Sequence, residues 1–303
     1  MKKVVIGILV ILVGVAVWFL MVKEHDHVIT FNANASQSSV YNHVKDAKFI
    51  DTTSIQDNAI IIDKVLFESF KQEVLVDNQK VILDWKFKAV ADTITKVNVG
   101  IINTENSIKH RLQALFKKSP LVKTVKDELI LFRWQFSKYT NMFKVTVDGE
   151  SEMPAMEIIT TNAKVKRDKK ATAMMKANSY LYPKLAENSI TQDGPPFVNI
   201  KNWDIEEDTI TFDFGIPIAH KDTLPDTIPN IVFGSVKSQK ALKATFYGNY
   251  AISDEAWFAL LDYAKRENIK LDNKPFEVFH NNPMAGGNQL DWKAEIFVPI
   301  LEN

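Results

Sequence analysis

The chain has 303 residues, 46% of them hydrophobic and 24% charged, which is ordinary for a folded protein. At roughly 100 to 150 residues per domain, this length predicts two domains. Lysine plus arginine equals aspartate plus glutamate at 37 each, so no basic excess exists to bind a phosphate backbone, and we expect no nucleic-acid partner. The absence of cysteine excludes disulfides, thiol nucleophiles and thiolate metal sites, and the six histidines are scattered without zinc-binding spacing. We therefore expect no metal and no cofactor.

An uninterrupted apolar run covers residues 4–22 near the N-terminus. Its length matches the ~20 residues that cross the hydrocarbon core of a bilayer, and it exceeds the apolar core of about 7 to 15 residues in a cleavable signal peptide. Lys2 and Lys3 precede the run, which favours a cytoplasmic N-terminus. The pattern predicts a retained transmembrane anchor over residues 1–24, in preference to a removed signal peptide, with the remaining residues outside the cytoplasm.

The next part of the chain, residues 27–148, has the pattern of a sheet followed by a long helix. A strand and a short helix over residues 36–45 precede four strand-like runs between residues 59 and 102. The long helix begins at Ser119-Pro120, an N-cap followed by proline at the first helical position. Its apolar side chains recur every three or four residues: Leu121, Val125, Leu129, Phe132, Phe136 and Tyr139. We expect a two-layer domain in which this helix covers a curved antiparallel sheet.

Residues 153–303 contain a degenerate internal repeat. Pro196-Phe197 aligns with Pro275-Phe276, and residues 214–218 align with residues 296–300, with an amphipathic helix ahead of each proline. Each half then reads strand, helix, strand, strand, and we expect the halves to pack as a pseudo-twofold pair around a cleft. The fold class is therefore α+β: an N-terminal transmembrane helix, a two-layer helix-grip domain and a duplicated β-α-β-β domain.

Four segments of the second half resemble the gyrase-inhibitor-like (GyrI-like) effector-binding family: Gly248-Asn249-Tyr250, Pro275-Phe276-Glu277-Val278-Phe279, Asn281-Asn282-Pro283 and the ending at residues 295–300. The chain departs from the family at Asn249, where the family usually has proline. In its layout, the first domain resembles the START-like/polyketide-cyclase (SRPBCC) superfamily. This pairing implies a bacterial protein anchored in the cytoplasmic membrane, with its domains on the extracytoplasmic side and a small-molecule cleft in which Glu277 is the ligand-contacting or catalytic acid.

Glu277 has the clearest functional signal, because its neighbours Phe276, Val278 and Phe279 are apolar and its counterpart in the repeat is Val198. Inside an aromatic cleft, desolvation would raise its pKa, and the carboxylate could pair with a cationic ligand or act as a general base. The alternation of a strand also allows the opposite orientation, in which Glu277 faces water. Large aromatic side chains are candidates for the pocket walls: Tyr180, Trp203, Phe246, Tyr250, Trp257, Phe279 and Trp292.

The function we expect is noncatalytic capture of a small hydrophobic, amphipathic or cationic molecule in the cleft of the second domain. Two alternatives stay open: a hydrolase of strained or electrophilic small molecules with Glu277 as general base, and an interaction module that binds a protein partner. The sequence contains no Gly-x-Ser-x-Gly elbow, phosphate-binding loop or helix-turn-helix pattern. It does not decide whether the protein is an enzyme.

Overall fold

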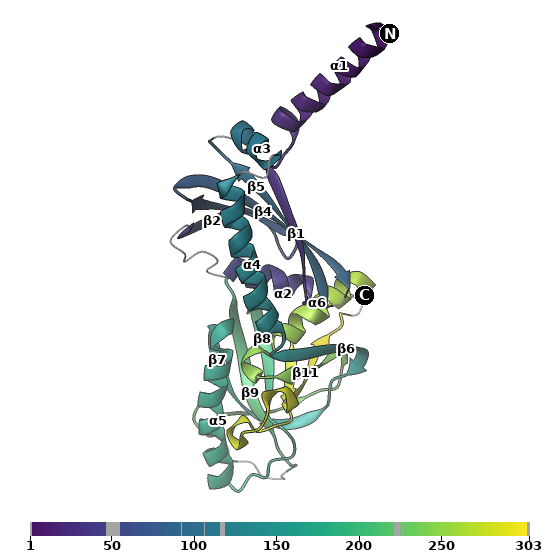
Figure 1. Cartoon of the computed structure of the whole chain (residues 1–303). Helices are drawn as coiled ribbons and strands as arrows, with labels where there is room; N and C mark the ends of the chain where they lie inside the picture. Colours follow the sequence, from purple (N-terminus) through teal and green to yellow (C-terminus); the bar gives the residue numbers. More distant parts are fainter. Residues whose placement is uncertain are drawn as a thin grey trace. The chain divides into compact units, whose positions relative to one another are not determined.

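The structure is a computed structural model that describes residues 2–46, 55–91, 93–105, 107–115, 119–220, 225 and 227–301. The chain is α+β and divides into two compact units, Met1–Lys138 and Tyr139–Asn303. Each unit is built on one antiparallel sheet (Figure 1). Residues 143–148, which the sequence pattern placed at the end of the first domain, belong to β6 (Phe143–Glu152) of the second sheet.

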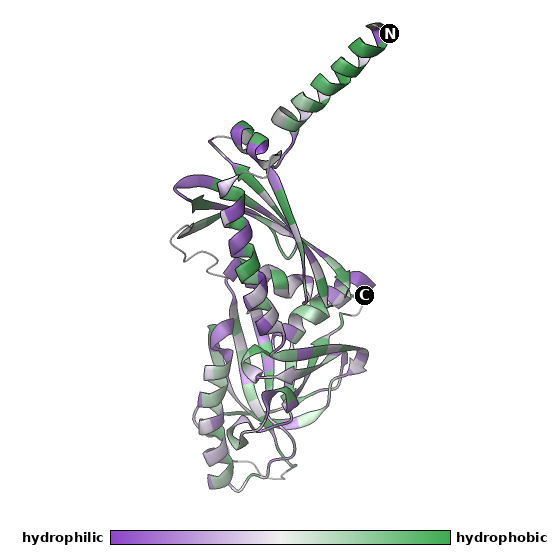
Figure 2. Ribbon diagram, in the orientation of Figure 1, coloured by the Kyte–Doolittle hydropathy of each residue, from purple (hydrophilic) through white to green (hydrophobic). Residues whose placement is uncertain are grey.

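The N-terminal apolar run forms two helical pieces. The α-helix α1 spans Lys2–Val17, and a π-helical turn, η1, spans Trp18–Val22. Figure 2 shows the apolar character of α1 along its length. Among the described residues, no helix combines the length and the apolar character that crossing a bilayer requires. The predicted transmembrane helix over residues 4–22 is therefore wrong, because the α-helical part of the run has 16 residues and stops short of the ~20 that a span needs.

The first unit has a five-stranded sheet in the order β1-β5-β4-β3-β2. Its elements are β1 (His27–Ala33), α2 (Gln37–Asp46), β2 (Ile55–Val65), β3 (Ser69–Val76), β4 (Gln79–Ala91), β5 (Ile94–Asn103), α3 (Ser107–Leu115) and α4 (Pro120–Thr140). Helix α4 starts as the sequence predicts, since the Ser119 hydroxyl accepts a hydrogen bond from Val122 N at 3.3 Å. Five members of its apolar stripe are buried: Leu121, Val125, Leu129, Phe132 and Phe136.

The core of the first unit is aromatic. Tyr41 of α2 and Trp85 of β4 are fully buried, and the Tyr41 ring lies edge-on to Phe70 at 5.4 Å and to Phe87 at 5.6 Å. His43 of α2 contacts Phe136 of α4 at 4.8 Å between ring centroids. Rings from the helices and the sheet thus fill the interior of the two-layer arrangement.

The second unit repeats one pattern of elements. The first half is β7 (Met156–Lys166), η2 (Arg167–Lys169), α5 (Lys170–Glu187), β8 (Phe197–Asp204) and β9 (Thr209–Pro217). After β10 (Val232–Val236), the second half is β11 (Lys240–Gly248), η3 (Tyr250–Ile252), α6 (Glu255–Glu267), β12 (Phe276–Phe279) and β13 (Lys293–Pro299), with the 3-10 turns η4 (Pro283–Ala285) and η5 (Gln289–Asp291) before β13. Both halves therefore read strand, helix, strand, strand.

The sheet order makes the symmetry of the two halves visible. The eight strands run β10-β7-β9-β8-β12-β13-β11-β6, so the six central strands mirror one another about the β8–β12 pair. At that pair Glu277 lies opposite Val198, and Phe276 and Phe197 stack at 5.1 Å between ring centroids. The two residues that the repeat aligned with each other, Val198 and Glu277, are thus cross-strand neighbours at the centre of the sheet.

Candidate functional site

Glu277 is fully buried in the second unit. Every residue of β12 is buried, and the exposed fraction of Glu277 is 0%. The orientation in which Glu277 faces water is therefore excluded for the described conformation. Its carboxylate accepts hydrogen bonds from Trp257 Nε1 at 2.6 Å and from Ser253 Oγ at 3.1 Å, both in the segment that leads into and forms α6. The carboxylate of Glu277 therefore lies inside the second unit, beside the indole ring of Trp257.

A lysine from the other half of the repeat neutralises Glu277. Lys170, the first residue of α5, is 0% exposed, and its Nζ donates to Glu277 Oε1 at 2.8 Å and Oε2 at 3.0 Å. The same ammonium group lies 2.9 Å from Ser253 Oγ and 4.6 Å from the centroid of the Trp257 ring. An acidic group, a hydroxyl and an aromatic face are the contacts an organic cation would use. Lys170 makes all of them from within the chain.

The pKa of Glu277 reflects this environment. Burial raises its pKa above the ordinary value, while the charge and hydrogen bonds of Lys170 oppose that shift. A buried carboxylate is stable only when such partners satisfy it, because desolvation of an isolated charge costs several kcal/mol. The pair also connects the two halves of the repeat, since Lys170 and Glu277 come from opposite sides of the pseudo-twofold axis.

Further charged groups continue from this pair toward the surface. Asp254 lies 3.8 Å from Lys170 Nζ and also pairs with Arg167, which makes a second ion pair with Asp208 at 2.7 Å. Glu255 accepts a hydrogen bond from the Tyr139 hydroxyl at 2.7 Å. Charges of opposite sign therefore alternate from the partly exposed Asp208 to the buried Glu277. This arrangement satisfies the buried groups at the start of both helices.

The predicted aromatic residues fall into separate places. Trp257, which donates to Glu277, also packs against Trp203, and the centroids of the two indole rings lie 5.1 Å apart. Trp257 is fully buried and Trp203 is 8% exposed. The indole N–H of Trp203 is buried and has no hydrogen-bond partner among the described residues. Phe246 is fully buried elsewhere and stacks on Phe143 of β6 at 6.0 Å.

A second cluster joins Tyr250, Phe279 and Trp292. The Tyr250 ring lies 4.8 Å from Phe279 and 6.0 Å from Trp292, and its hydroxyl donates to the Lys293 carbonyl at 2.8 Å. Burial raises the pKa of Tyr250 to about 12. The Asn249 side chain fixes the turn that follows Gly248, because its Oδ1 accepts a hydrogen bond from Ala251 N at 2.9 Å.

Tyr180, the remaining residue of the predicted set, lines an open groove in the first half of the repeat, apart from Glu277. The groove has a volume of about 1030 Å³ and lies along α5, β7 and the residues that lead into β10. Its lining consists of Thr161, Asn162, Ala163, Lys164, Val165, Lys169, Thr172, Ala173, Lys176, Ala177, Tyr180, Asn230, Ile231 and Val232. Glu277 and the other predicted aromatic residues are not part of it.

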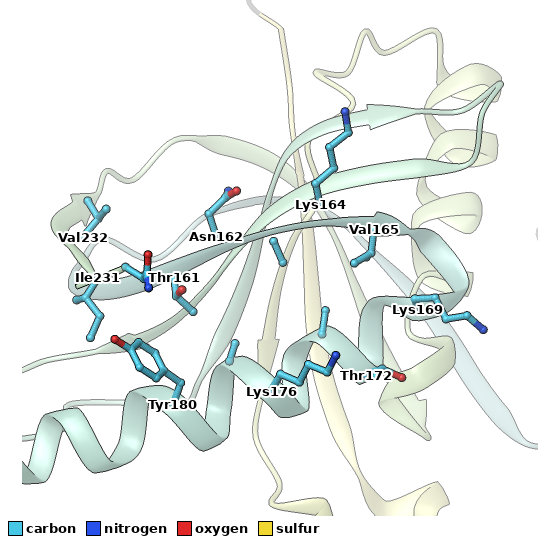
Figure 3. A pocket seen from close by; sticks show the side chains of 14 residues that line it. Thr161, Asn162, Lys164, Val165, Lys169, Thr172, Lys176, Tyr180, Ile231 and Val232 are labelled. Carbon is cyan, nitrogen blue, oxygen red and sulfur yellow. The ribbon is translucent and has the colours of Figure 1, made fainter. Parts of the chain in front are cut away.

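The groove exists because the residues that precede β10 do not pair with β7. The two strands pair from Met156 to Thr160, where Val232 is the last partner, whereas β7 continues to Lys166 alongside β9. The Tyr180 hydroxyl donates to the Pro229 carbonyl at 2.5 Å and so holds the diverging segment against α5. Figure 3 shows Tyr180 directed from α5 toward Ile231, and Lys164 extended from β7 away from the helix.

Sequence reasoning missed the residues that complete the Glu277 site. Lys170 occupies a position in the buried stripe of α5 together with Met174, Ala177, Leu181 and Leu185. A lysine at helical spacing within an apolar stripe is a signal that its ammonium group meets a buried acid. That signal identifies the inward-facing lysine, but the identity of its partner depends on contacts between residues 107 positions apart.

No protein-family profile matches the chain, and no curated protein matches it. Several solved structures are similar to its fold. The C-terminal domain of EcmrR aligns over 54% of this chain and 99% of its own length, with 15% identity and a TM-score of 0.42. SAV2435, whose structure holds tetraphenylphosphonium, aligns over 52% of this chain and 94% of its own length, with 8% identity and a TM-score of 0.37. A hydrolase from Listeria innocua aligns over 55% of this chain and 98% of its own length, with 11% identity and a TM-score of 0.34.

EcmrR is also known in a complex with DNA, which aligns over 66% of this chain with 16% identity and a TM-score of 0.44. The comparisons therefore give no support to the exclusion of nucleic acid as a partner. At identities and TM-scores this low, the likeness carries no argument about what this chain binds or catalyses.

Proposed function

We propose that the second unit binds a small, partly apolar molecule in the groove between α5, β7 and residues 230–232. The groove itself carries the proposal: its volume of about 1030 Å³ lies at the upper limit of the about 300–1,000 Å³ that ligand pockets span, so it has room for one ligand. Apolar side chains such as Ile231 and Val232 lie beside hydroxyl, amide and ammonium groups. A GyrI-like effector-binding fold for this unit, joined to an SRPBCC-like first unit, belongs to the same proposal and is supported by the repeated β-α-β-β order.

The groove is a better ligand site than Glu277 in the described conformation. Glu277 already receives hydrogen bonds from Lys170, Ser253 and Trp257, and its side chain has no exposed surface. An external cation would have to displace the Lys170 ammonium group, and a hydrolytic water would have to reach a carboxylate that is 0% exposed. The hydrolase and the interaction module stay predictions that no observation favours.

The binding site can be tested with N-phenyl-1-naphthylamine, a neutral apolar fluorophore that emits more strongly in apolar surroundings. Ala173 lines the groove and is partly exposed, so Ala173→Phe should fill the groove and weaken probe binding. Ala171 is partly exposed on the same helix but outside the lining, and Ala171→Phe is the matched control. Probe binding that survives Ala173→Phe but is lost in Glu277→Gln, with folding intact, would move the site to Glu277 and refute the proposal.

A further inference from the structure

The lining of the groove carries charge of one sign. Three lysines contribute to it, Lys164, Lys169 and Lys176, and none of its described residues is an aspartate or a glutamate. Lys169 forms an ion pair at 3.0 Å with its neighbour Asp168, and both side chains are largely exposed. A concave surface with low-dielectric walls and cations only raises the local concentration of anions.

Lys176 is the cation best placed to contact a ligand. It lies on α5 between Ala173 and Tyr180, which also line the groove, and it is exposed. No ion pair of Lys176 or of Lys164 occurs among the described residues, in contrast to Lys184 on the same helix, which pairs with Glu187 at 2.6 Å. Lys164 extends away from α5 (Figure 3), so it contributes mainly to the field, whereas Lys176 is available for direct contact.

The rest of the lining separates into polar and apolar parts. Thr161 and Thr172 offer hydroxyl groups, whereas the Asn162 amide already donates to Phe212 O and Asp213 Oδ1. The apolar surface comes from Ala163, Val165, Ala173, Ala177, Ile231 and Val232. A purely polar anion would leave this apolar surface in water, and a purely apolar ligand would desolvate ammonium groups without compensation. An amphipathic anion satisfies both requirements.

We infer that the ligand of the groove is a single-chain amphipathic anion, of the class of a long-chain carboxylate, with Lys176 holding the carboxylate and the apolar residues covering the chain. This inference rests on the proposed function. The sequence led us to expect a hydrophobic, amphipathic or cationic ligand, and this inference keeps the amphipathic class but makes the ligand an anion. The change follows because the acidic site is filled by Lys170 and the open site is basic.

The test uses three ligands with the same chain: laurate, dodecanol and dodecyltrimethylammonium. Each competes with N-phenyl-1-naphthylamine for the full-length protein, with laurate and dodecyltrimethylammonium below their micellar concentrations and dodecanol below its solubility limit. Laurate should displace the probe at the lowest concentration. Lys176→Gln should weaken laurate binding about three- to tenfold and leave dodecanol unchanged, because only the anion uses the ammonium group. Lys184→Gln on the same helix removes an equal charge outside the groove and should leave both unchanged.

The outcomes separate the ligand class from the site. The groove stands as the site if Ala173→Phe weakens probe binding. The anionic ligand is overturned if dodecanol or dodecyltrimethylammonium then displaces the probe as effectively as laurate does. Laurate binding that is insensitive to Lys176→Gln and to the charge reversal Lys176→Glu would overturn the role of Lys176 and the inference with it. If Ala173→Phe does not affect the probe, the proposed function fails first.

Discussion

Replacement of Lys170 by methionine is the most direct test of the buried pair. Methionine keeps an unbranched aliphatic stem but removes the ammonium group that contacts both oxygens of Glu277. Removing one partner of a buried ion pair typically costs about 3–5 kcal/mol, because it leaves a desolvated charge without compensation. A domain has roughly 5–15 kcal/mol of stability in total, so Lys170→Met should remove a large fraction of it. Ser253 and Trp257 still donate to Glu277 and keep the cost within that range.

The cost should depend on pH and on Glu277. A carboxyl whose folded pKa lies above its unfolded value of 4.5 binds its proton more tightly when folded. The free energy of unfolding of Lys170→Met should therefore fall as pH rises from about 4.5 toward the folded pKa. In the double variant Lys170→Met/Glu277→Gln, the neutral amide still accepts hydrogen bonds, and at least about 2 kcal/mol should return.

Hydrogen exchange of β12 amides in the full-length protein, combined with urea unfolding, measures these changes. Lys184→Met is the control on the same helix; because its pair with Glu187 is solvent-exposed, this variant should leave stability almost unchanged. A cost below about 1 kcal/mol for Lys170→Met, or a double variant whose loss equals the sum of the single losses, would refute the argument that the pair compensates a buried charge.

Three further predictions concern other parts of the fold. In urea unfolding, Trp203→Phe should lower the free energy of unfolding by less than about 1 kcal/mol, because the buried N–H of Trp203 has no partner among the described residues. Trp257→Phe should lower it by at least about 2 kcal/mol, because the N–H of Trp257 donates to Glu277. Equal losses for the two variants would contradict this. Gly248→Ala should lower stability by about 2 kcal/mol or more in the same assay, since its φ is +152° and an added Cβ would lie 2.8 Å from Phe143 Cβ. The control is Gly234→Ala, where an added Cβ would have nothing within 4 Å; equal losses in urea unfolding for the two variants would argue against this reasoning. Burial lowers the pKa of His43 from 6.5 to about 4. The first unit should therefore lose up to about 3 kcal/mol of stability as the pH falls from 6.5 toward 4. A His43→Phe variant with the same pH profile would exclude this cause.

Local patterns predicted the elements that depend on neighbours in sequence. The N-cap at Ser119 and the apolar stripe of α4 are found as expected, because capping and helical periodicity involve residues only a few positions apart. The strand-helix-strand-strand order of both halves of the second unit has the same origin. The apolar N-terminal run was readable as well, but its division into α1 and the π-helical turn was not, because composition does not distinguish one helical hydrogen-bond pattern from another.

The candidate site shows the limit of this reasoning. Glu277 was recognisable from its apolar neighbours and its counterpart Val198, both of which are properties of the sequence. The partner Lys170 and the groove at the edge of β7 were not predicted. The pair joins residues 107 positions apart, and the groove depends on where β10 leaves β7.

By itself, the sequence determined that the chain contains two units of α+β type, the repeated order of elements in the second, and an acidic residue in an apolar strand. The tertiary structure decided that a lysine from the other half of the repeat fills the acidic site, and that the open groove is lined by cations. The physical reason is the range of the interactions. Periodicity and capping act within a few residues along the chain, whereas compensation of a buried charge and the shape of a groove depend on which strands and helices become neighbours in space.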